Sequence, residues 1–376
     1  MDFSLSPRHA ARRDEFRDFA EREIQPAEKD YPRENLRRMA GRGYLGLPIP
    51  RQWGGQGEDF LTYILLIEEI SRVCASTGVI LAVHTSVGSF PLLYYGTASQ
   101  KELYLRRLAS GEMIGAFALT ETQAGSDAAA LGATARRVNG GYVLNGCKLF
   151  ITSGGEADLY TVFATVDRSL SSRGICAFLV EKGTPGLSAG PRERKMGLHG
   201  SATTELRFDE MLLPPANLLG SEGGGFRIAL SLLEGGRIGI AAQGLGLARA
   251  ALESTAAHIA ASGQCGTAAG QAARFILADL FTRLEAARLL VWRAACFKDA
   301  GRPCTREASM AKQYATDLAV QASARCLDLW AAAGMSLDNP LTRYFCDAKV
   351  TQIYEGSNQI QRIVIARELL KSLAKI

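Results

Sequence analysis

The spacing of the apolar residues changes twice along the chain, and no other feature of the sequence constrains the fold as strongly. In residues 1–114 they recur at three- and four-residue steps, as at Phe16 and Phe19, which is typical of amphipathic helices. In residues 115–220 they form short runs broken by Gly, Asn, Pro and Ser, which is typical of strands. In residues 221–376 the helical spacing returns in long alanine-rich stretches. We therefore expect helices, then a β region, then helices again.

These changes predict an α+β fold of three domains, which suits a chain of 376 residues at roughly 150 residues per domain. The domains are an N-terminal helical domain (1–114), a middle β domain that is barrel-like or a sandwich (115–220), and a C-terminal four-helix bundle (221–376). In the middle domain, Asn139-Gly140-Gly141 and Asn145-Gly146 predict hairpin turns. A buried helix is expected at 60–73, and strands are expected at 115–119, 134–137, 142–144, 160–165, 176–180 and 205–208.

The composition excludes several classes of protein. Hydrophobic residues make up 47% and charged residues 22% of the chain, which is ordinary for a globular protein and unlike a disordered one. The net charge is +5, but Lys and Arg are interleaved with Asp and Glu, so we predict no nucleic-acid surface. The run at 63–67 ends at Glu68 and Glu69, well short of the roughly 18 apolar residues of a membrane span. We predict no membrane span.

The N-terminal residues and the cysteines indicate the compartment. Residues 2–15 mix acidic and basic side chains within a helical pattern and contain no apolar signal core, so a cytoplasmic location is expected. The 8 cysteines form no C-x-x-C pair, and with 4 histidines the sequence offers no metal-ligand spacing. We therefore expect free thiols and no metal site.

Two short motifs match well-known patterns but lack the structural context of those patterns. Residues 41–46 fit the G-x-G-x-x-G of dinucleotide sites, yet a helical pattern precedes them where a strand is needed. Residues 186–190 fit the G-x-S-x-G of esterases, yet prolines flank them and no helical pattern follows. We interpret the first as a helix end with a turn and the second as a loop between strands.

Two segments of the middle domain carry residues that suit a ligand. Residues 117–127 run from a strand into a Gly/Ser loop, whose N–H groups and hydroxyls can hold a polar ligand, although an ordinary loop would look similar. Residues 145–155 place Phe150 and Thr152 two apart, and therefore on one face of a strand.

A third segment near the C-terminus contains a carboxylate at a helix break. In residues 347–362 the pair Glu355-Gly356 interrupts a helical pattern, and Ser357-Asn358 is typical of the start of a new helix. A carboxylate at such a break is usually solvated. From the residues alone, Glu355 is therefore either a surface charge or a catalytic group.

Taken in this order, the segments resemble the acyl-CoA dehydrogenase family over nearly the whole chain. The connecting sequence is most similar to the short-chain and short-branched-chain members. The resemblance implies the helical–β–helical fold already expected, an FAD cofactor, and oxidation of an acyl-CoA to the trans-2-enoyl-CoA. Its two most specific motifs are Ala118-Leu119-Thr120-Glu121 with Ala124-Gly125-Ser126-Asp127, and Ile353-Tyr354-Glu355-Gly356-Ser357 with Gln359-Ile360-Gln361-Arg362.

The resemblance also implies roles for individual residues. Glu355 is the base for the α-proton, and its backbone N–H, with a ribityl hydroxyl of FAD, holds the thioester carbonyl. Some members carry the base on a neighbouring helix just before an arginine, but that position is Gly236 here. The substrate-binding residues implied are Ser126, Arg237 and Gly356. The FAD-binding residues implied are Phe117, Leu119, Thr120, Gly125, Ser126, Phe150, Thr152, Ser357 and Gln359, with Gln271 reaching FAD from the neighbouring subunit.

Members of the family have partners as well as a substrate. The resemblance implies an electron-transfer flavoprotein that reoxidises the flavin. It also implies a homotetramer, built as a dimer of dimers, because FAD lies between subunits. A short-chain acyl-CoA is the expected substrate.

The sequence departs from the family pattern at a cluster of positions. Several of them belong to the part of the family's fold that meets FAD across the subunit interface. We predict weakened or rearranged FAD binding with intact active-site chemistry, because each lost charge-assisted hydrogen bond costs roughly 10- to 100-fold in affinity. The positions are Ser262, Cys265, Asp328, Ala331, Ala332 and Cys346, where the family usually has Arg, Phe, Gln, Gly, Gly and Arg.

These departures leave three alternatives to the leading interpretation. The first is the same chemistry on an acyl group tethered to a carrier protein in a biosynthetic pathway. The second is an oxidase or oxygenase, in which the reduced flavin reacts with oxygen. The third is a degenerate, flavin-poor paralogue with a binding or structural role, which the retention of Glu355 argues against.

Overall fold

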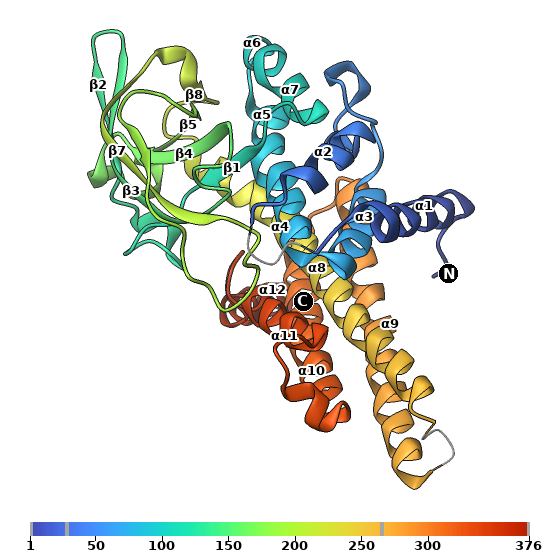
Figure 1. Ribbon diagram of the computed structural model, residues 1–376. Helices are drawn as coiled ribbons and strands as arrows, with labels where there is room; N and C mark the ends of the chain where they lie inside the picture. The colour runs from blue at the N-terminus through green and yellow to red at the C-terminus, as the bar shows by residue number, and fades with distance from the viewer. Residues whose placement is uncertain (1–2, 27–29, 264–266, 374–376) are drawn as a thin grey trace.

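The computed structural model describes residues 3–26, 30–263 and 267–373, and it has the helical–β–helical order that the sequence predicts (Figure 1). The N-terminal helices pack beside one half of the C-terminal helices, and the β region lies to one side of both (Figure 1). One hydrophobic core runs through both helical regions, and a second, smaller core fills the β region.

The N-terminal region is built around one almost completely buried helix. This helix, α3 (Phe60–Val73), has the bounds expected for the buried helix, and Asp59 caps it by accepting a hydrogen bond from the Thr62 N–H at 2.8 Å. Its buried side chains contact α1, α4, α8 and α9. The other helices of the region are α1 (Pro7–Glu23), α2 (Arg33–Gly41), α4 (Ala75–Val83), α5 (Phe90–Tyr95), α6 (Ala98–Gln100) and α7 (Arg106–Ser110), with π-helical turns at His84–Ser89 and Lys101–Leu105.

The β region is one mixed sheet of eight strands. Strand β1 pairs in parallel with β4, which also pairs with β2 and β5. Seven strands follow one another in the order β6-β7-β3-β2-β4-β5-β8, and β1 lies outside this order, paired with β4. The strands are β1 (Gly115–Ala118), β2 (Thr134–Val138), β3 (Gly141–Thr152), β4 (Leu159–Thr165), β5 (Ile175–Glu181), β6 (Leu187–Ala189), β7 (Thr203–Leu213) and β8 (Leu218–Leu219).

One of the two predicted hairpin turns is confirmed and the other is wrong. Asn139-Gly140 connects β2 to β3 as predicted. Asn145-Gly146 instead lies inside β3, where the register with β7 shifts between Leu144 and Gly146. At this irregularity Gly146 has φ +144°, and a Cβ there would lie 2.7 Å from the Cβ of Ala133. The glycine therefore serves a bulge with close packing rather than a turn.

A buried histidine joins the N-terminal helices to the first strand. The Gly115 N–H donates to His84 Nδ1 at 3.1 Å, and His84 Nε2 lies 3.1 Å from the Leu108 carbonyl oxygen. Burial lowers the pKa of His84 to about 4, so its imidazole is neutral and donates through Nε2. His84 is therefore a satisfied core residue.

The C-terminal region is a helical bundle organised around α8 (Gly225–Ala261). This helix contacts α9 (Ala268–Asp299), α10 (Thr305–Leu329) and α11 (Pro340–Thr351), as well as α3 of the N-terminal region. Helix α12 (Asn358–Leu373) packs on α10. The ends of α8 and α9 project as a long hairpin beyond the other helices (Figure 1). The predicted fold class is thus confirmed.

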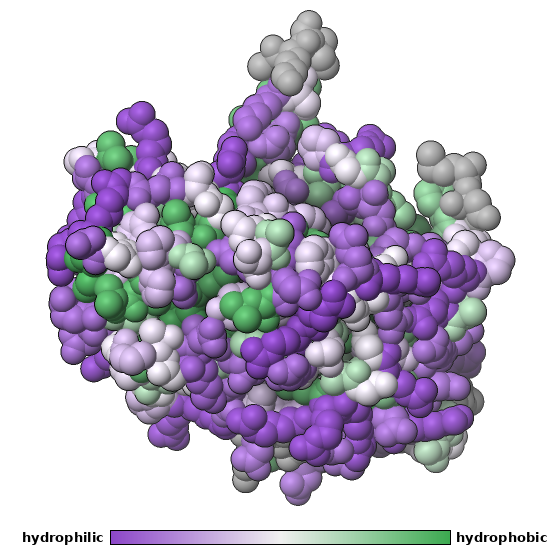
Figure 2. Space-filling model, turned by 90° about the horizontal axis from the view of Figure 1, so that it is seen from above, coloured by the Kyte–Doolittle hydropathy of each residue, from purple (hydrophilic) through white to green (hydrophobic). Residues whose placement is uncertain are grey.

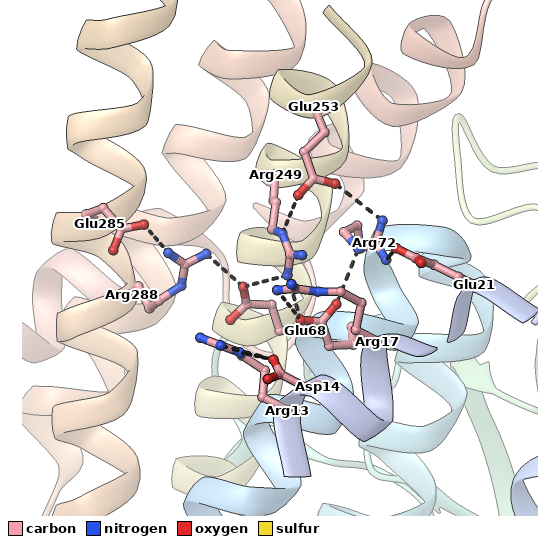
Figure 3. Close-up of polar contacts among 11 residues, drawn as sticks. Arg13, Asp14, Arg17, Glu21, Glu68, Arg72, Arg249, Glu253, Glu285 and Arg288 are labelled. Carbon is pink, nitrogen blue, oxygen red and sulfur yellow. Dashed lines mark hydrogen bonds and ion pairs between the residues drawn. The ribbon is translucent and has the colours of Figure 1, made fainter. Parts of the chain in front are cut away.

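A network of buried charges connects four helices of the two helical regions (Figure 3). Glu68 and Glu69 of α3 are 3% and 0% exposed. Arg249 of α8 donates to Glu69 Oε1 at 2.6 Å and lies 3.6 Å from Glu68 Oε1. Arg288 of α9 reaches Glu68 at 3.0 Å, and Arg17 of α1 lies 3.5 Å from Glu69. Arg249 is the centre of the network, since it contacts both carboxylates.

The surface and one apolar helical stretch bear on the expected absence of a membrane span. The face seen in Figure 2 is mostly hydrophilic, with a hydrophobic area on the side of the β region. The continuous helical stretch Ala75–Tyr95 is long and apolar enough to cross a membrane by length and composition. However, 94% of its most apolar window is buried inside the protein, as in the core helix of a globular domain.

Of the two look-alike motifs, the first has the expected helix end and turn, whereas the expectation of a loop between strands for residues 186–190 is wrong, because Leu187–Ala189 form a strand. Helix α2 ends at Gly41, and Gly43 follows with φ +69°, so a helix end and a turn occupy residues 41–46. Residues 186–190 contain the short strand β6, which pairs with β7. Neither has the strand–turn–helix geometry that its look-alike chemistry needs.

Candidate active site

Glu355 lies in the connection between α11 and α12, in an unusual backbone conformation. Its φ is +53°, and Gly356 follows with φ +80°. A left-handed conformation is rare for a residue with a side chain, and it marks sites where the surrounding structure imposes it. The residue is partly exposed, yet its Oε2 is buried and accepts no hydrogen bond from the described residues. The alternative of a solvated surface carboxylate is therefore wrong.

The environment of the Glu355 carboxylate favours its neutral form. Burial raises the pKa of Glu355, and the positive charges of Arg237 and Lys312 oppose this shift only in part. Two tyrosines, the buried Tyr63 of α3 and the partly buried Tyr354, lie within electrostatic reach of the carboxylate. Desolvation is the main cause that raises the pKa of both phenols, and the charge of Glu355 adds to it. A carboxyl group with a raised pKa is suited to take a proton near neutral pH.

Helix α8 approaches the carboxylate through a glycine. A Cβ on Gly236 would lie 2.6 Å from Glu355 Oε2 and 2.9 Å from its Cδ. The absence of a side chain at 236 therefore makes the space in which the Glu355 carboxylate lies. The next residue, Arg237, is 9% exposed, its Nε has no hydrogen-bond partner among the described residues, and its Nη1 lies 3.4 Å from Ser309 Oγ. Arg237 thus lies within electrostatic reach of Glu355, although more than a hundred residues separate the two in sequence.

The Gly/Ser loop after β1 is held by a buried ion pair. Lys148 of β3 is 0% exposed and donates to Glu121 Oε1 at 2.6 Å and to the Leu119 carbonyl at 3.0 Å. Glu121 in turn accepts hydrogen bonds from the Gly132 and Ala133 N–H groups. Lys148 is not among the residues predicted for the site, because its only signal in the sequence is a lysine flanked by apolar residues in a strand.

The five loop residues predicted to meet FAD and substrate differ in exposure. Phe117 of β1 packs its ring 4.9 Å from that of Phe163, and Leu119 is buried. Further along, Gly125 and Ser126 are exposed, and a Cβ on Gly125 would meet open space. Thr120 lies between, partly buried, and its carbonyl accepts from the Leu149 N–H at 2.8 Å. The loop therefore offers an open, polar edge beside a fixed apolar base.

The sequence predicts Phe150 and Thr152 on one face of a regular strand, but β3 is not regular there. The register with β7 shifts between Lys148 and Ile151, and Phe150 has φ +56°. Ile151 points into the core, whereas Phe150 is 63% exposed and Thr152 partly buried. A large aromatic ring in a left-handed conformation and exposed to solvent is what a planar ligand would cover.

The remaining predicted residues lie at two helix N-termini. Ser357 caps α12, and its Oγ accepts from the Ile360 N–H at 3.5 Å, while Gln359 is exposed in the first turn. Gln271 is exposed in the first turn of α9, which starts near the tip of the α8–α9 hairpin (Figure 1). The single chain does not bring Gln271 to the other predicted residues.

The structure describes most of the positions that depart from the family pattern. Asp328 has a side chain 73% exposed and lies 3.9 Å from Arg325, and Ala331 has φ +49°, so it keeps a glycine-like backbone. Next to them, Trp330 stacks on His258 at 4.1 Å and donates to Thr255 at 3.2 Å. Ser262 ends α8, and Cys346 is a partly buried free thiol. Cys265 and the side chain of Ala332 lie outside the described part of the structure.

Three family models match this chain and together cover most of it. The N-terminal domain of acyl-CoA dehydrogenase matches residues 6–112, the middle domain residues 116–211, and the C-terminal domain residues 223–370. The matches follow one another in the order of the three structural regions.

Similar structures have the same fold over nearly the whole chain. Butyryl-CoA dehydrogenase from Megasphaera elsdenii is 40% identical with a TM-score of 0.94, covering 98% of this chain and 100% of that chain. A chain in a structure of the electron transferring flavoprotein of Acidaminococcus fermentans is 43% identical, with a TM-score of 0.95 over 98% and 100%. The prolyl acyl carrier protein oxidase AnaB is 32% identical, with a TM-score of 0.93 over 97% and 100%.

Curated relatives are similar over their full lengths. An acyl-CoA dehydrogenase from Bacillus subtilis is 51% identical, covering 94% of this chain and 96% of its own length. A short-chain specific acyl-CoA dehydrogenase from Clostridium acetobutylicum is 42% identical, covering 99% of this chain and 100% of its own length. With the three matched domains and the buried carboxylate at the helix break, these similarities show that the chain belongs to the acyl-CoA dehydrogenase family.

Proposed function

We propose that this protein is an FAD-dependent dehydrogenase that converts a short-chain acyl-CoA to the trans-2-enoyl-CoA, with Glu355 as the base. The observation that carries the proposal is the Glu355 carboxylate, which is buried without a hydrogen-bond partner for Oε2 and faces the side-chain-free surface of Gly236. A buried, unpartnered carboxylate is costly to a fold, so its presence is explained best by chemistry. The short-chain and butyryl-CoA relatives support the substrate class.

The residues present fit an FAD group. The exposed Phe150 ring, the open space at Gly125 and the unpartnered Arg237 Nε are features that the chain alone leaves unexplained. When bound, the flavin supplies a hydride acceptor for the β-carbon. The residues proposed to hold it are Phe117, Leu119, Thr120, Gly125, Ser126, Phe150, Thr152, Ser357 and Gln359, with Gln271 from a neighbouring subunit.

Glu355 acts at the α-carbon through its side chain and at the thioester through its backbone. Its carboxylate takes the α-proton, and burial keeps the pKa of Glu355 above its ordinary range, which strengthens it as a base. Within the described residues, the Glu355 N–H donates no hydrogen bond. It is therefore free to donate to the thioester carbonyl and to stabilise the negative charge that develops there. Arg237 and Gly356 border the same space, and Ser126 is placed to meet the substrate farther out.

Partners and assembly complete the proposal. An electron-transfer flavoprotein as the electron acceptor is supported by the structural similarity to a chain from a structure of such a protein. A homotetramer, as a dimer of dimers, is supported by the exposed position of Gln271, which needs a second subunit to approach the other FAD residues. The departures at Ser262 and Asp328 lead us to expect weaker FAD binding than in typical members.

A carrier-protein substrate is the second candidate. It is favoured by the similarity to the prolyl acyl carrier protein oxidase AnaB, which has the same fold over nearly the whole chain. An acyl carrier protein presents the same pantetheine arm as CoA but lacks the adenine nucleotide. The Glu355 chemistry would be unchanged, so only the substrate comparison separates the two candidates.

The test is an anaerobic titration of the FAD-loaded protein with butyryl-, isobutyryl- and 2-methylbutyryl-CoA, and with butyryl carrier protein. We expect butyryl-CoA to bleach the flavin band near 450 nm, and Glu355→Gln to bind the ligand without bleaching. Faster bleaching by the carrier protein would favour the second candidate. Bleaching of Glu355→Gln at the parent rate would refute the assignment of Glu355 as the base. Absence of a flavin band after incubation with FAD would refute the proposed FAD-dependent activity.

A further inference from the structure

The backbone carbonyls of Glu355 and Gly356 both accept hydrogen bonds from buried side chains. Gln361 Nε2 donates to the Glu355 carbonyl at 3.2 Å and to the Gly356 carbonyl at 2.8 Å. Lys312 Nζ donates to the Gly356 carbonyl at 2.9 Å. Each donor comes from a helix, Gln361 from α12 and Lys312 from α10. The left-handed corner at 355–356 is therefore fixed from two directions.

Lys312 is an unexpected residue for this place. It is 0% exposed, although a lysine is almost never fully buried without a specific partner. Besides the Gly356 carbonyl, its Nζ donates only to Asn358 Oδ1, at 2.9 Å, within the described residues. Asn358 is fixed by donating to Thr316 Oγ1 at 2.9 Å and to Asp317 Oδ1 at 2.7 Å. We name Lys312, Asn358 and Gln361 the corner clamp.

The clamp acts on the atoms that the proposed chemistry uses. The Glu355 N–H and carboxylate lie one residue before the peptide that Lys312 holds, and Glu355 adopts a conformation that L-residues disfavour. Such a conformation persists only where contacts over-determine it. A loss of the Lys312 contact would let the corner relax and would turn the N–H and the carboxylate away together.

We propose that Lys312 is a positioning residue for catalysis: by holding the Gly356 carbonyl, it aims the Glu355 N–H at the thioester and the Glu355 carboxylate at the α-proton. This inference rests on the proposed function of Glu355, but it assigns to Lys312 a role of its own. Lys312 touches neither reacting carbon, and it acts through the backbone. Packing between helices alone would explain why Lys312 is buried. It would not explain why Lys312 Nζ donates to the carbonyl of Gly356, the residue that follows the base.

The contact does not depend on the charge of the lysine. Burial lowers the pKa of Lys312 to about 7, with Glu355 and Asp317 opposing this shift and Arg237 adding to it. A neutral amine still has two N–H groups, which is enough for the Gly356 carbonyl and for Asn358. The positioning therefore survives the titration of Lys312.

The test compares Lys312→Met with Lys349→Met in the FAD-loaded protein. Methionine keeps the length of the side chain and removes its donors, and Lys349 is an exposed lysine of α11 close in sequence to the corner. For Lys312→Met we expect kcat with butyryl-CoA to fall roughly 10- to 100-fold, as for loss of a hydrogen bond to a charged group. We expect KM to change by less than threefold, and Lys349→Met to match the parent.

A spectroscopic measurement separates positioning from a purely structural role. In the Glu355→Gln background, the carbonyl stretch of bound [1-¹³C]butyryl-CoA reports hydrogen bonding to the thioester. We expect a smaller downshift when Lys312→Met is added. If Lys312→Met does not fold, Gln361→Met removes the other donor and takes its place in both measurements. An unchanged kcat and stretch would refute the positioning role, whereas an inactive parent protein would refute the proposed function instead.

Discussion

At the scale of single residues, the features of Glu355 point in one direction. Its Oε2 lacks a partner, its backbone is left-handed, and its N–H is unused by the described chain. Each of these costs stability, and a bound thioester would give the N–H the acceptor that it lacks. A site that is strained when free of ligand is typical of a place where function, rather than folding, selects the residue.

The pH dependence of the reaction should follow the raised pKa of Glu355. A base works in its deprotonated form, so kcat/KM should rise with pH through that pKa and be lost as the pH falls below it. Because burial raises the pKa of Glu355, this rising limb should lie above the ordinary glutamate value of about 4.3. The measurement is kcat/KM with butyryl-CoA between pH 5 and 9. A limb centred near the ordinary value would contradict a desolvated base.

A methyl group on Gly236 should impair the base without harming the fold. The new Cβ of Gly236→Ala would lie 2.6 Å from Glu355 Oε2, so the carboxylate has to move. We expect kcat to fall about tenfold or more. The matched control is Gly235→Ala on the same helix, whose Cβ would be 3.4 Å from the flexible end of Lys298. Both substitutions raise the helix propensity by the same amount, so a difference in activity reports the contact with Glu355. Equal activities of the two variants would show that a Cβ at 236 does not displace the Glu355 carboxylate.

The sequence revealed Glu355 but could not reveal the residues that hold it. Glu355 stands out because it interrupts a helical pattern next to a glycine. Lys312 and Lys148 look like ordinary charges of a helix and a strand, and only the fold shows that both are fully buried. The proximity of Gly236 to Glu355 also depends on how α8 packs against the corner, which no local pattern contains.

At the scale of elements, the sequence predicted those with a strong internal pattern. Helix α3 has the bounds expected for the buried helix, β4 differs from the prediction by one residue at one end, and β5 differs by one residue at each end. The error at Asn145-Gly146 has a physical reason. An Asn-Gly pair indicates a turn locally, but here pairing with β7 continues beyond it and the glycine is used for a bulge.

The helices also depend on a contact that the sequence could not show, the buried charge network of Figure 3. Arg249→Met should lower the free energy of unfolding by about 3 kcal/mol, because it leaves buried Glu69 with only more distant cations. Chemical denaturation measures the loss. The control Arg22→Met breaks an exposed pair with Asp18 and should cost less than about 1 kcal/mol. If both variants unfolded alike, the network would not stabilise the fold.

The double variant Arg249→Met with Glu69→Met extends this prediction. It removes the buried carboxylate together with its nearest cation, so no buried carboxylate is left without that partner, although Arg17 and Arg72 lose a more distant contact. Replacement of buried ion pairs by apolar side chains is often close to neutral. We expect the double variant to recover most of the stability that Arg249→Met loses. If its free energy of unfolding instead fell by the sum of the losses of the two single variants, Arg249 and Glu69 would not be coupled.

At the scale of the whole molecule, large apolar side chains are exposed on two C-terminal helices. Phe275 and Phe281 of α9 are 63% and 57% exposed, and Ile363 and Leu370 of α12 are 62% and 65% exposed. Apolar surface gathered on helices is typical of faces that other subunits cover. The three-domain order was readable from the sequence, but this surface was not, since a helical period does not tell which stripe faces a core and which faces a partner.

Assembly should therefore fail when this surface is made charged. We expect the parent to sediment with the mass of four 40.4 kDa subunits and Phe281→Asp to sediment as a smaller species. The variant should also retain less FAD, because the proposed contact from Gln271 crosses the interface. Leu212→Asp is the control, since Leu212 of β7 is equally exposed, at 57%, but lies on the sheet. A parent that sediments as a monomer would contradict the proposed tetramer.

The close approach of Gly236 to Glu355 has a consequence for any second carboxylate at this place. A side chain on residue 236 would enter the space of Glu355 Oε2, so a carboxylate on that side chain would lie close to the existing one. Two carboxylates that share a site disfavour each other's ionised form, so a chain with both would have to displace or neutralise one of them. In this protein the position of the base therefore depends on the missing side chain at 236 as well as on the glutamate at 355.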